Sequence, residues 1–380
     1  MSRIDIASNA RRQGAESQSH QSMVLLSRLL LTPKGEEDIS SSMTATLLSE
    51  VQNIDREQFD NLVELASSNH VIIRGMEVFL SITQAAGDQR RAEWAQLALM
   101  KERARIDLAV RFLRNICHTF ENAHFDVAVI KSLDHWPDLG SDLDLYTDAN
   151  SDDVAKLMMD DFGAQIAPRS WGDCLARKWN FMIPGLPEAV EIHMGRLGQT
   201  GEQVTFASRI MQRARLSIIG NQTFRVPSTS DRLMISTLQR MYRHFYFRLC
   251  DIVDSAELVR AGAIDYQDLR TAATDAGIWE GVATYLLIVS DYVRNYSDSG
   301  LALPQFVLEA ARFGGAELFY AKDFLRVPIM PQSAKLYGSQ LALLLRKREL
   351  QNGARLSLLP WLATAAVVSQ RITGSDKGIW

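Results

Sequence analysis

Apolar residues recur at steps of three, four and seven along much of residues 22–125, and this spacing lines one face of a helix. The most regular stripe lies between residues 99 and 120, with charged residues on the opposite side. Shorter stretches of the same kind come before it, separated by Ser, Asp and Asn. The pattern predicts a helical N-terminal region, whose most regular stripe consists of Leu99, Ile106, Val110, Leu113, Cys117 and Phe120.

From about residue 126 the pattern changes to short apolar or alternating runs, which are typical of strands. One helix is predicted among them at residues 151–163, with Gly163 as its end. Pro184-Gly185 provides a turn between two strands, and Gly220-Asn221 the turn of a hairpin. This mixture predicts an α+β core, with strands at residues 127–130, 142–146, 178–183 and 189–194 and a hairpin at 216–226.

Beyond Pro227 the chain returns to a helical pattern that opens on Ser, Thr and Asp, which favour helix starts. The helix expected there carries Arg240, Arg243, Arg248 and Asp251, and we expect it to cover the core. The predicted organisation is a frayed or disordered N-terminus at 1–21, a helical region at 22–125, a core at 126–227 and a C-terminal helical domain at 228–380.

Composition and charge limit the classes of partner that we expect for this chain. The formal net charge of the 380 residues is −4, so there is no basic excess to attract long nucleic acid. The three cysteines lie far apart without zinc-type spacing, which indicates reduced thiols. The N-terminus lacks the apolar segment of a secretory signal, and the longest apolar run, residues 356–368, falls short of the ~20 residues that span a bilayer. We therefore expect a cytoplasmic protein without a membrane span.

Two acidic segments are the candidates for chemistry. Asp142 and Asp144 alternate with apolar residues on a predicted strand, so both side chains point to one face. Two like charges this close repel each other unless a cation lies between them. Glu191 lies between Val190 and Ile192 on a later strand. Surface acids on an edge strand are the alternative for the first pair, and Glu188 is the alternative third acid.

The order of these motifs resembles the nucleotidyltransferase superfamily, which has the DNA polymerase β-like fold. Its signature is an apolar residue, Gly-Gly or Gly-Ser, a short spacer and an Asp-x-Asp or Asp-x-Glu strand, matched here by Ile130-Lys131-Ser132 and Asp142-Leu143-Asp144. Over roughly residues 40–260 the chain is most similar to a group of uncharacterised bacterial nucleotidyltransferases with Lys-Gly, Asp-x-Asp and Val-Asp-Leu-His motifs. Two positions depart from the pattern: Lys131 replaces the first glycine, and Glu191 replaces an Asp.

The resemblance implies a mixed sheet flanked by helical regions, and a site in which Asp142, Asp144 and Glu191 bind two Mg²⁺ ions, with Mn²⁺ as an alternative metal. It implies that Lys131 and Ser132 contact the phosphates of a nucleoside triphosphate, for which we take ATP, and that Arg248 and Asp251, which can pair on one helical face, lie toward the nucleotide. A solvent-exposed lysine and a salt-bridged surface helix are the alternatives for these last residues. His193 shares the strand face of Glu191, either as a structural histidine or as a group that positions the acceptor.

The function implied by the resemblance is transfer of a nucleoside monophosphate, taken as AMP, to a hydroxyl or phosphate of a small molecule, sugar, peptide or protein, with release of pyrophosphate. A catalytically weakened nucleotide-binding or protein-interaction module is the second hypothesis, because the phosphate-loop glycine is missing. An antitoxin-like enzyme that adenylylates a partner protein is the third. The acceptor is not indicated by any motif.

Overall fold

The computed structural model describes residues 19–32, 41–297, 299–362 and 364–365. Residues 1–18 of the segment predicted to be frayed lie outside the described residues. Its last three residues, 19–21, are instead helical and begin a helix that continues to residue 31. No helix in the described part of the chain is long and apolar enough to cross a membrane.

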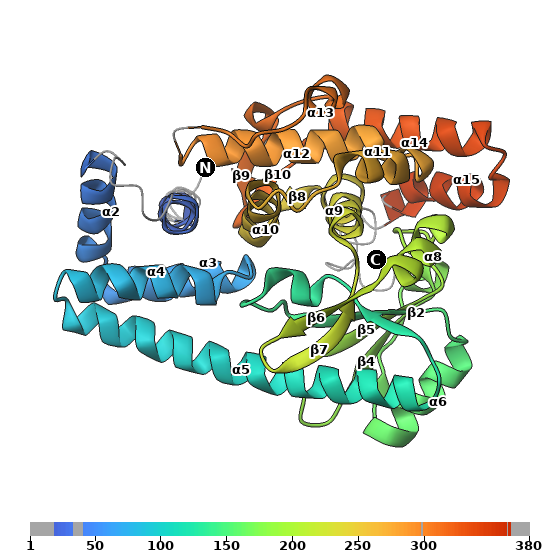
Figure 1. The fold of residues 1–380 in the computed structure, drawn as a ribbon, viewed down its shortest axis with the longest axis horizontal. Coiled ribbons are helices and arrows are strands. Elements are labelled where there is room, and N and C mark those ends of the chain that lie inside the picture. Colours follow the sequence, from blue (N-terminus) through green and yellow to red (C-terminus); the bar gives the residue numbers. More distant parts are fainter. Residues whose placement is uncertain (1–18, 33–40, 298, 363, 366–380) are drawn as a thin grey trace, which may run out of the picture.

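The predicted N-terminal helical region is confirmed wherever it is described. Its longest helix, α5, buries all six residues of the predicted stripe and runs from the other N-terminal helices to the sheet (Figure 1). Asp55 begins α3 with a capping box, in which its side chain accepts a hydrogen bond from the amide of Gln58. After the helix at 19–31, the helices of this region are α2 (Ser41–Asn53), α3 (Arg56–Ser68), α4 (Ile72–Ala85) and α5 (Gln89–Asn122).

The core contains a mixed sheet of five strands in the order β1-β2-β5-β4-β3. Strands β2 and β5 are parallel neighbours, and the other pairs are antiparallel. β5 is the central strand and β2 lies next to it, and both are almost completely buried, as expected of apolar runs covered on two sides. The strands are β1 (Val127–Val129), β2 (Asp142–Thr147), β3 (Gln165–Ile166), β4 (Lys178–Met182) and β5 (Ala189–Met194).

The remaining core elements also follow the sequence pattern. Helix α6 (Ser151–Phe162) ends at Gly163, which adopts the left-handed conformation of a helix C-cap. The predicted hairpin is formed by β6 (Arg215–Ile219) and β7 (Gln222–Val226), which make a separate two-stranded sheet. Three short segments complete the core, namely η1 (Ser132–His135), α7 (Trp171–Ala176) and α8 (Val204–Arg213).

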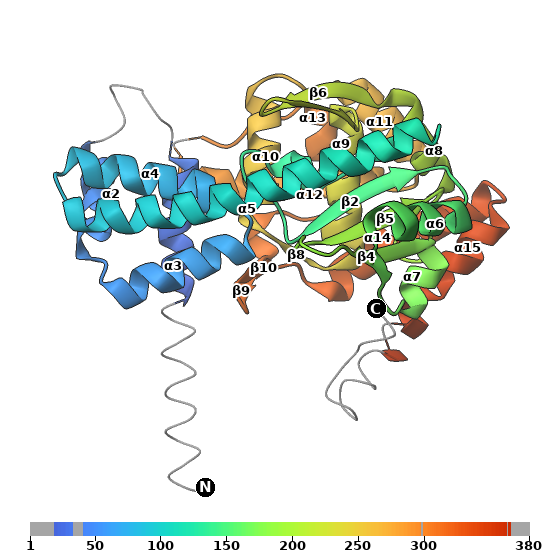
Figure 2. The ribbon, with the colours of Figure 1, turned by 90° about the horizontal axis from the view of Figure 1, so that it is seen from below.

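The C-terminal region is mainly helical, as predicted, but it also contains a small three-stranded sheet that the sequence pattern did not indicate. Its helices lie across the sheet from α5 and α6 (Figures 1 and 2). Its elements are α9 (Thr229–Thr237), η2 (Leu238–Arg243), β8 (Tyr246–Phe247), α10 (Leu249–Arg260), α11 (Tyr266–Asp275), α12 (Trp279–Arg294), α13 (Gln305–Ala310), η3 (Gly315–Glu317), β9 (Phe319–Ala321), β10 (Phe324–Arg326), η4 (Ile329–Ser333), α14 (Ala334–Arg346) and α15 (Leu350–Ser357).

The prediction that a single helix carries residues 240–251 is wrong. Helix α9 continues into the wider turn η2, and the chain then leaves the helical path at Phe245, whose φ is +55°. It forms β8 and re-enters a helix only at Leu249. Because of this break, Arg240 and Arg243 belong to a different element from Asp251.

Candidate functional site

The predicted acids come together where β2 and β5 run side by side. The parallel register places Asp144 directly opposite Glu191, and Asp142 opposite Ala189. Asp142 and Asp144 share one face of β2 because successive side chains of a strand alternate. Asp142 is half-buried, whereas Asp144 and Glu191 are buried. Glu188, the alternative third acid, lies outside this group and pairs with Arg105.

The ammonium group of Lys131 lies between the two buried acids. It forms ion pairs with Asp144 Oδ1 and with Glu191 Oε1, the second at 3.2 Å. The backbone of Lys131 has φ +62° and ψ −59°, and the amide of Ser132 donates to the carbonyl of Ile130 at 2.6 Å across it. This tight three-residue turn is strained for a residue with a Cβ. The loop thus keeps a glycine-like backbone at the position where the resembling superfamily has glycine.

Further groups neutralise Glu191. Lys178 Nζ lies 2.8 Å from Glu191 Oε2 and also 2.8 Å from Asp173. His193, which shares the face of Glu191 as expected, has its Nε2 at 2.8 Å from Glu191 Oε1. By contrast, no ion-pair partner of Asp142 is found among the described residues. Asp142 is therefore the carboxylate of the group that is open to a further cation.

The surroundings shift the pKa values of these groups in opposite directions. Burial works to raise the pKa of Glu191, but Lys131, His193 and Lys178 outweigh it, so that its pKa lies well below the usual range. The charge of Asp144, together with burial, raises the pKa of Asp142 to about 6. Burial works to lower the pKa of Lys131, but Asp144 and Glu191 raise it overall. Glu191 and Lys131 consequently stay charged at neutral pH.

The acids open onto a cleft of about 170 Å³ whose lining also includes basic residues. No carboxylate lies within ion-pair distance of Arg243 or Arg248 in the part of the chain that the structure describes. Arg240 is neutralised by Asp251, whose Oδ2 lies 2.7 Å from its Nε. The cleft is thus lined both by acids and by unpaired guanidinium groups. Its lining includes Lys131, Ser132, His135, Asp142, Asp144, Glu191, Arg240, Arg243, His244 and Arg248.

The other predicted nucleotide contacts have definite positions. Ser132 lines the cleft, but its Oγ accepts from the amide of Asp144 at 2.7 Å and donates to the carbonyl of Asp142 at 3.3 Å. Arg248 also lines the cleft. The expected ion pair of Arg248 with Asp251 is not formed: the Asp251 carboxylate accepts from the backbone amide of Arg248 at 2.8 Å and pairs with Arg240. The break between η2 and α10 allows this, because it brings Arg240 onto the first turn of α10.

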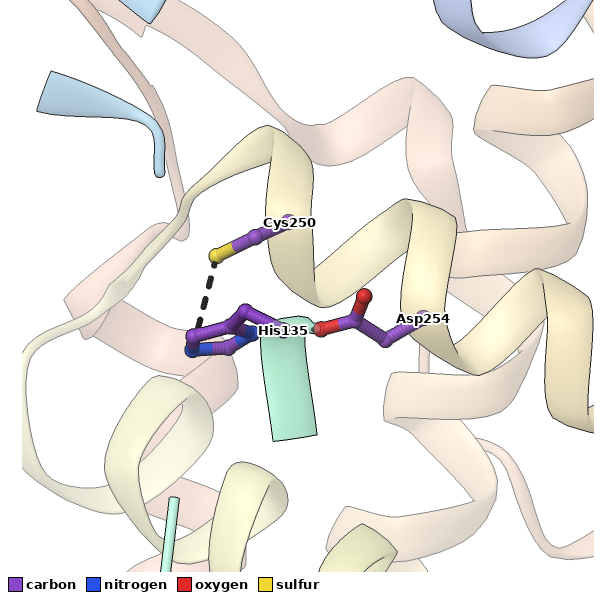
Figure 3. Close-up of side chains that lie close together, drawn as sticks. All are labelled: His135, Cys250 and Asp254. Carbon is purple, nitrogen blue, oxygen red and sulfur yellow. Dashed lines mark hydrogen bonds and ion pairs between the residues drawn. The ribbon is translucent and has the colours of Figure 1, made fainter. Parts of the chain in front are cut away.

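A second cluster, His135, Cys250 and Asp254, lies beside the cleft (Figure 3). Cys250 and Asp254 project from successive turns of α10 toward the His135 ring on η1. Asp254 Oδ2 is 2.5 Å from His135 Nδ1, and Cys250 Sγ is 3.8 Å from His135 Nε2. Asp254 also binds Arg74 at 2.6 Å, so its carboxylate is committed on both oxygens. The thiol and the other ring nitrogen contact each other, and we assign this cluster a structural role.

Arg74 extends this cluster to the N-terminal helices. Its Nε donates to Asp138 at 2.8 Å, and Asp138 also accepts from the amide of Ile73 at 2.6 Å in the first turn of α4. Burial works to lower the pKa of His135, but Cys250 and Asp254 together raise it well above the usual value. A protonated His135 thus stabilises the contact between η1 and α10.

Sequence reasoning did not select His70, His135 or Arg74. His135 and Cys250 are 115 residues apart, so no local spacing reveals them. The one available signal was that Cys250 and Asp254 are four residues apart in a predicted helix and share one face. All three cysteines are free, in agreement with the prediction of reduced thiols.

Comparison of the chain with protein-family models, with curated proteins and with solved structures found no match.

The donor set suits Mg²⁺, because Mg²⁺ prefers carboxylate oxygens and Asp142 is open. Any ion bound by Asp144 or Glu191, however, competes with the Lys131 ammonium. We therefore expect Lys131→Ala to lower the free energy of unfolding in metal-free buffer by about 3 kcal/mol, since it leaves buried carboxylates without their partner. Lys131→Gly removes the same charge and relieves the backbone strain, so it is expected to be about 1 kcal/mol more stable than Lys131→Ala.

Millimolar Mg²⁺ should raise the melting temperature of both variants more than that of the wild type, as measured by circular dichroism. If Mg²⁺ stabilises all three proteins equally, the ammonium and the metal do not compete for the same carboxylates.

The raised pKa of His135 makes stability dependent on pH. His135 is charged in the folded state up to a higher pH than in the unfolded chain, so its contribution is complete below about pH 6.5 and is lost as pH rises through the folded-state pKa. His135→Asn keeps a donor to Asp254 but cannot titrate. The difference in urea-unfolding free energy between the two proteins should therefore be larger at about pH 5.5 than at about pH 9. The charged or titratable groups that act on His135 include Arg74, Asp134, Asp254, Cys250 and His70. A difference that stays constant over this range would show that His135 does not titrate as described.

Proposed function

We propose that this protein is a magnesium-dependent nucleotidyltransferase that moves a nucleoside monophosphate, with ATP as the expected donor, to an acceptor and releases pyrophosphate. One observation carries the proposal. Asp142, Asp144 and Glu191 on β2 and β5 line the same cleft as Arg243 and Arg248, which have no carboxylate partner among the described residues. A metal-bound triphosphate needs both carboxylates for its cation and guanidinium groups for its phosphate oxygens.

The strand arrangement supports the proposal. β1 and β2 form an antiparallel pair that carries the Lys131 loop and the Asp-x-Asp motif, and β5 adds its acid from the parallel neighbour. These are the positions that the resemblance to the superfamily assigns to its loop and to its three carboxylates.

The chemistry follows from the positions. Asp142 and Asp144 hold the cation of the donor, and Arg243 and Arg248 bind the outgoing phosphates. Bound there, Mg²⁺ would neutralise phosphate charge and assist the departure of pyrophosphate. The acceptor hydroxyl forms the new bond to the α-phosphorus and releases its proton to water, the bond from that phosphorus to the bridging oxygen breaks, and pyrophosphate takes the electron pair.

A second candidate function is a nucleotide-binding module with little or no catalysis. The position of Lys131 favours it, because a tethered ammonium already occupies the space between Asp144 and Glu191. In such a protein the basic wall of the cleft still binds phosphate, whereas the cation required for transfer has to displace Lys131.

Labelled product separates the two functions. The protein is incubated with Mg²⁺, α-labelled ATP and a lysate of its native host, and the label is followed into acceptors. Asp142→Asn combined with Asp144→Asn should abolish labelling, because both carboxylate charges that hold the cation are lost. Asp153→Asn, an exposed acid in the first turn of α6, is the matched control and should label normally. Label that persists in the double variant would contradict the metal assignment. ATP binding without pyrophosphate release would favour the binding module.

Binding of ATP should depend on the unpaired arginines under either function. Arg243→Ala and Arg248→Ala are each expected to weaken ATP binding about tenfold, the effect of losing one charge-assisted hydrogen bond. Isothermal titration calorimetry in the presence of Mg²⁺ measures this. Arg260→Ala, at the exposed end of α10, serves as the control. Unchanged affinity in both cleft variants would place the phosphates elsewhere.

A further inference from the structure

A second cavity opens beside the cleft and shares part of its wall. Its volume is about 240 Å³, about eight times the ~30 Å³ that a water molecule takes up in the liquid, so a ligand of the size of a sugar fits. His70, Gly140 and Ser141 line both spaces. The rest of the lining comes from the N-terminal helices, the loop before β2 and the segment before β5, namely Ser67, Ile72, Glu102, Arg105, Leu139, Pro187 and Glu188.

Arg105 uses all its donors within the protein. Its Nε and Nη2 bind the two carboxylate oxygens of Glu102 at 3.0 and 2.6 Å. Its Nη1 binds Glu188 Oε1 at 2.5 Å and the carbonyl of Gly140 at 3.2 Å, and Nη2 also reaches the carbonyl of Leu139 at 3.0 Å. Arg105 is therefore a link between α5, the loop before β2 and the start of β5, with no donor left for a ligand.

One carboxylate oxygen of Glu188 accepts no hydrogen bond from the residues that the structure describes. The side chain is 3% exposed, and its Oε2 is buried without a hydrogen-bond partner. A buried carboxylate oxygen that lacks a donor costs more free energy than almost any other polar group. With Glu102, Glu188 and Arg105 together, the cavity wall carries a net charge of about −1. The group that suits this wall is a cationic hydrogen-bond donor.

We propose that this cavity binds the acceptor of the transfer reaction, and that the acceptor is a small hydroxylated ammonium compound whose cationic group meets Glu188. The assignment of this ligand as the acceptor rests on the proposed nucleotidyl transfer, whereas the binding site itself does not.

The position of Gly140, which lines both the cavity and the cleft, supports this assignment. A Cβ atom at Gly140 would lie 3.1 Å from His70 Nδ1 and 3.7 Å from Asp142 Oδ1, so the absence of a side chain keeps His70 and Asp142 accessible to each other. A hydroxyl that reaches through from the cavity comes beside Asp142. Burial lowers the pKa of His70 most, and the nearby charges of Arg248 and His135 lower it further, so that it lies well below its usual value. The unprotonated ring can accept a hydrogen bond from that hydroxyl.

Two matched polyols test the proposal on the full chain without nucleotide. Glucamine carries an ammonium group where sorbitol carries a hydroxyl, and saturation-transfer NMR measures the affinity for each. Glucamine is expected to bind about tenfold more tightly than sorbitol, as one charge-assisted hydrogen bond requires. Glu188→Gln should reduce this preference to roughly none. Because Glu188→Gln also loosens Arg105 and the variant can fail to fold, Ser67→Trp gives a second route: it fills the cavity from an exposed position of α3.

Ser67→Trp should abolish glucamine binding, and Ser81→Trp, at an exposed position of α4, should leave it intact. Absence of glucamine binding to the wild type, equal binding of sorbitol, or binding retained in Ser67→Trp would each overturn the proposal. ATP binding is measured on the same samples. Retained ATP binding without glucamine binding refutes the acceptor cavity alone, whereas glucamine binding without ATP binding refutes the nucleotide function and leaves the cavity as a binding site.

Discussion

The repulsion between carboxylates at the junction of β2 and β5 is the constraint on which the site depends. Parallel pairing places Asp144 opposite Glu191, with Asp142 on the same face. Buried carboxylates on neighbouring strand positions repel each other and are tolerated only when cations lie between them. The protein provides two of its own, the ammonium groups of Lys131 and Lys178. The carboxylates are thus neutralised by the protein itself, and a metal bound by Asp144 or Glu191 would compete with Lys131.

The position of Lys131 depends in turn on the loop that carries it. Arg74 joins Asp138 at one end of this loop to Asp254 on α10, and Asp254 also binds His135 on η1. Three segments that are distant in the sequence therefore meet through one guanidinium group and its two carboxylates. Arg248 lies at the start of α10, and Arg240 of η2 pairs with Asp251 on the same helix. Because the network holds α10, it also positions these basic residues of the cleft.

The cleft and the neighbouring cavity share His70, Gly140 and Ser141 and differ in electrostatic character. The cleft is lined by an open carboxylate and by unpaired arginines, whereas the lining of the cavity includes Glu188, whose buried Oε2 has no donor among the described residues. Gly140, which lines both spaces, adjoins both Asp142 and His70. Such an arrangement suits two ligands of different charge that meet beside Asp142.

Sequence alone determined the local elements, because their signals are short-range. The period of apolar residues gave α5, the alternation of acids and apolar residues gave β2, and Gly163 marked the end of α6. The adjacency of Asp142 and Asp144 follows from strand geometry in the same way. Tertiary structure decided the rest: the pairing of Asp144 with Glu191, the entry of Lys131 between them, the break at Phe245 that gives Asp251 to Arg240, and the cluster of His135 with Cys250. The residues in these contacts are far apart in the sequence, by 115 positions for His135 and Cys250. The packing of the chain brings them together, and no local pattern encodes that packing.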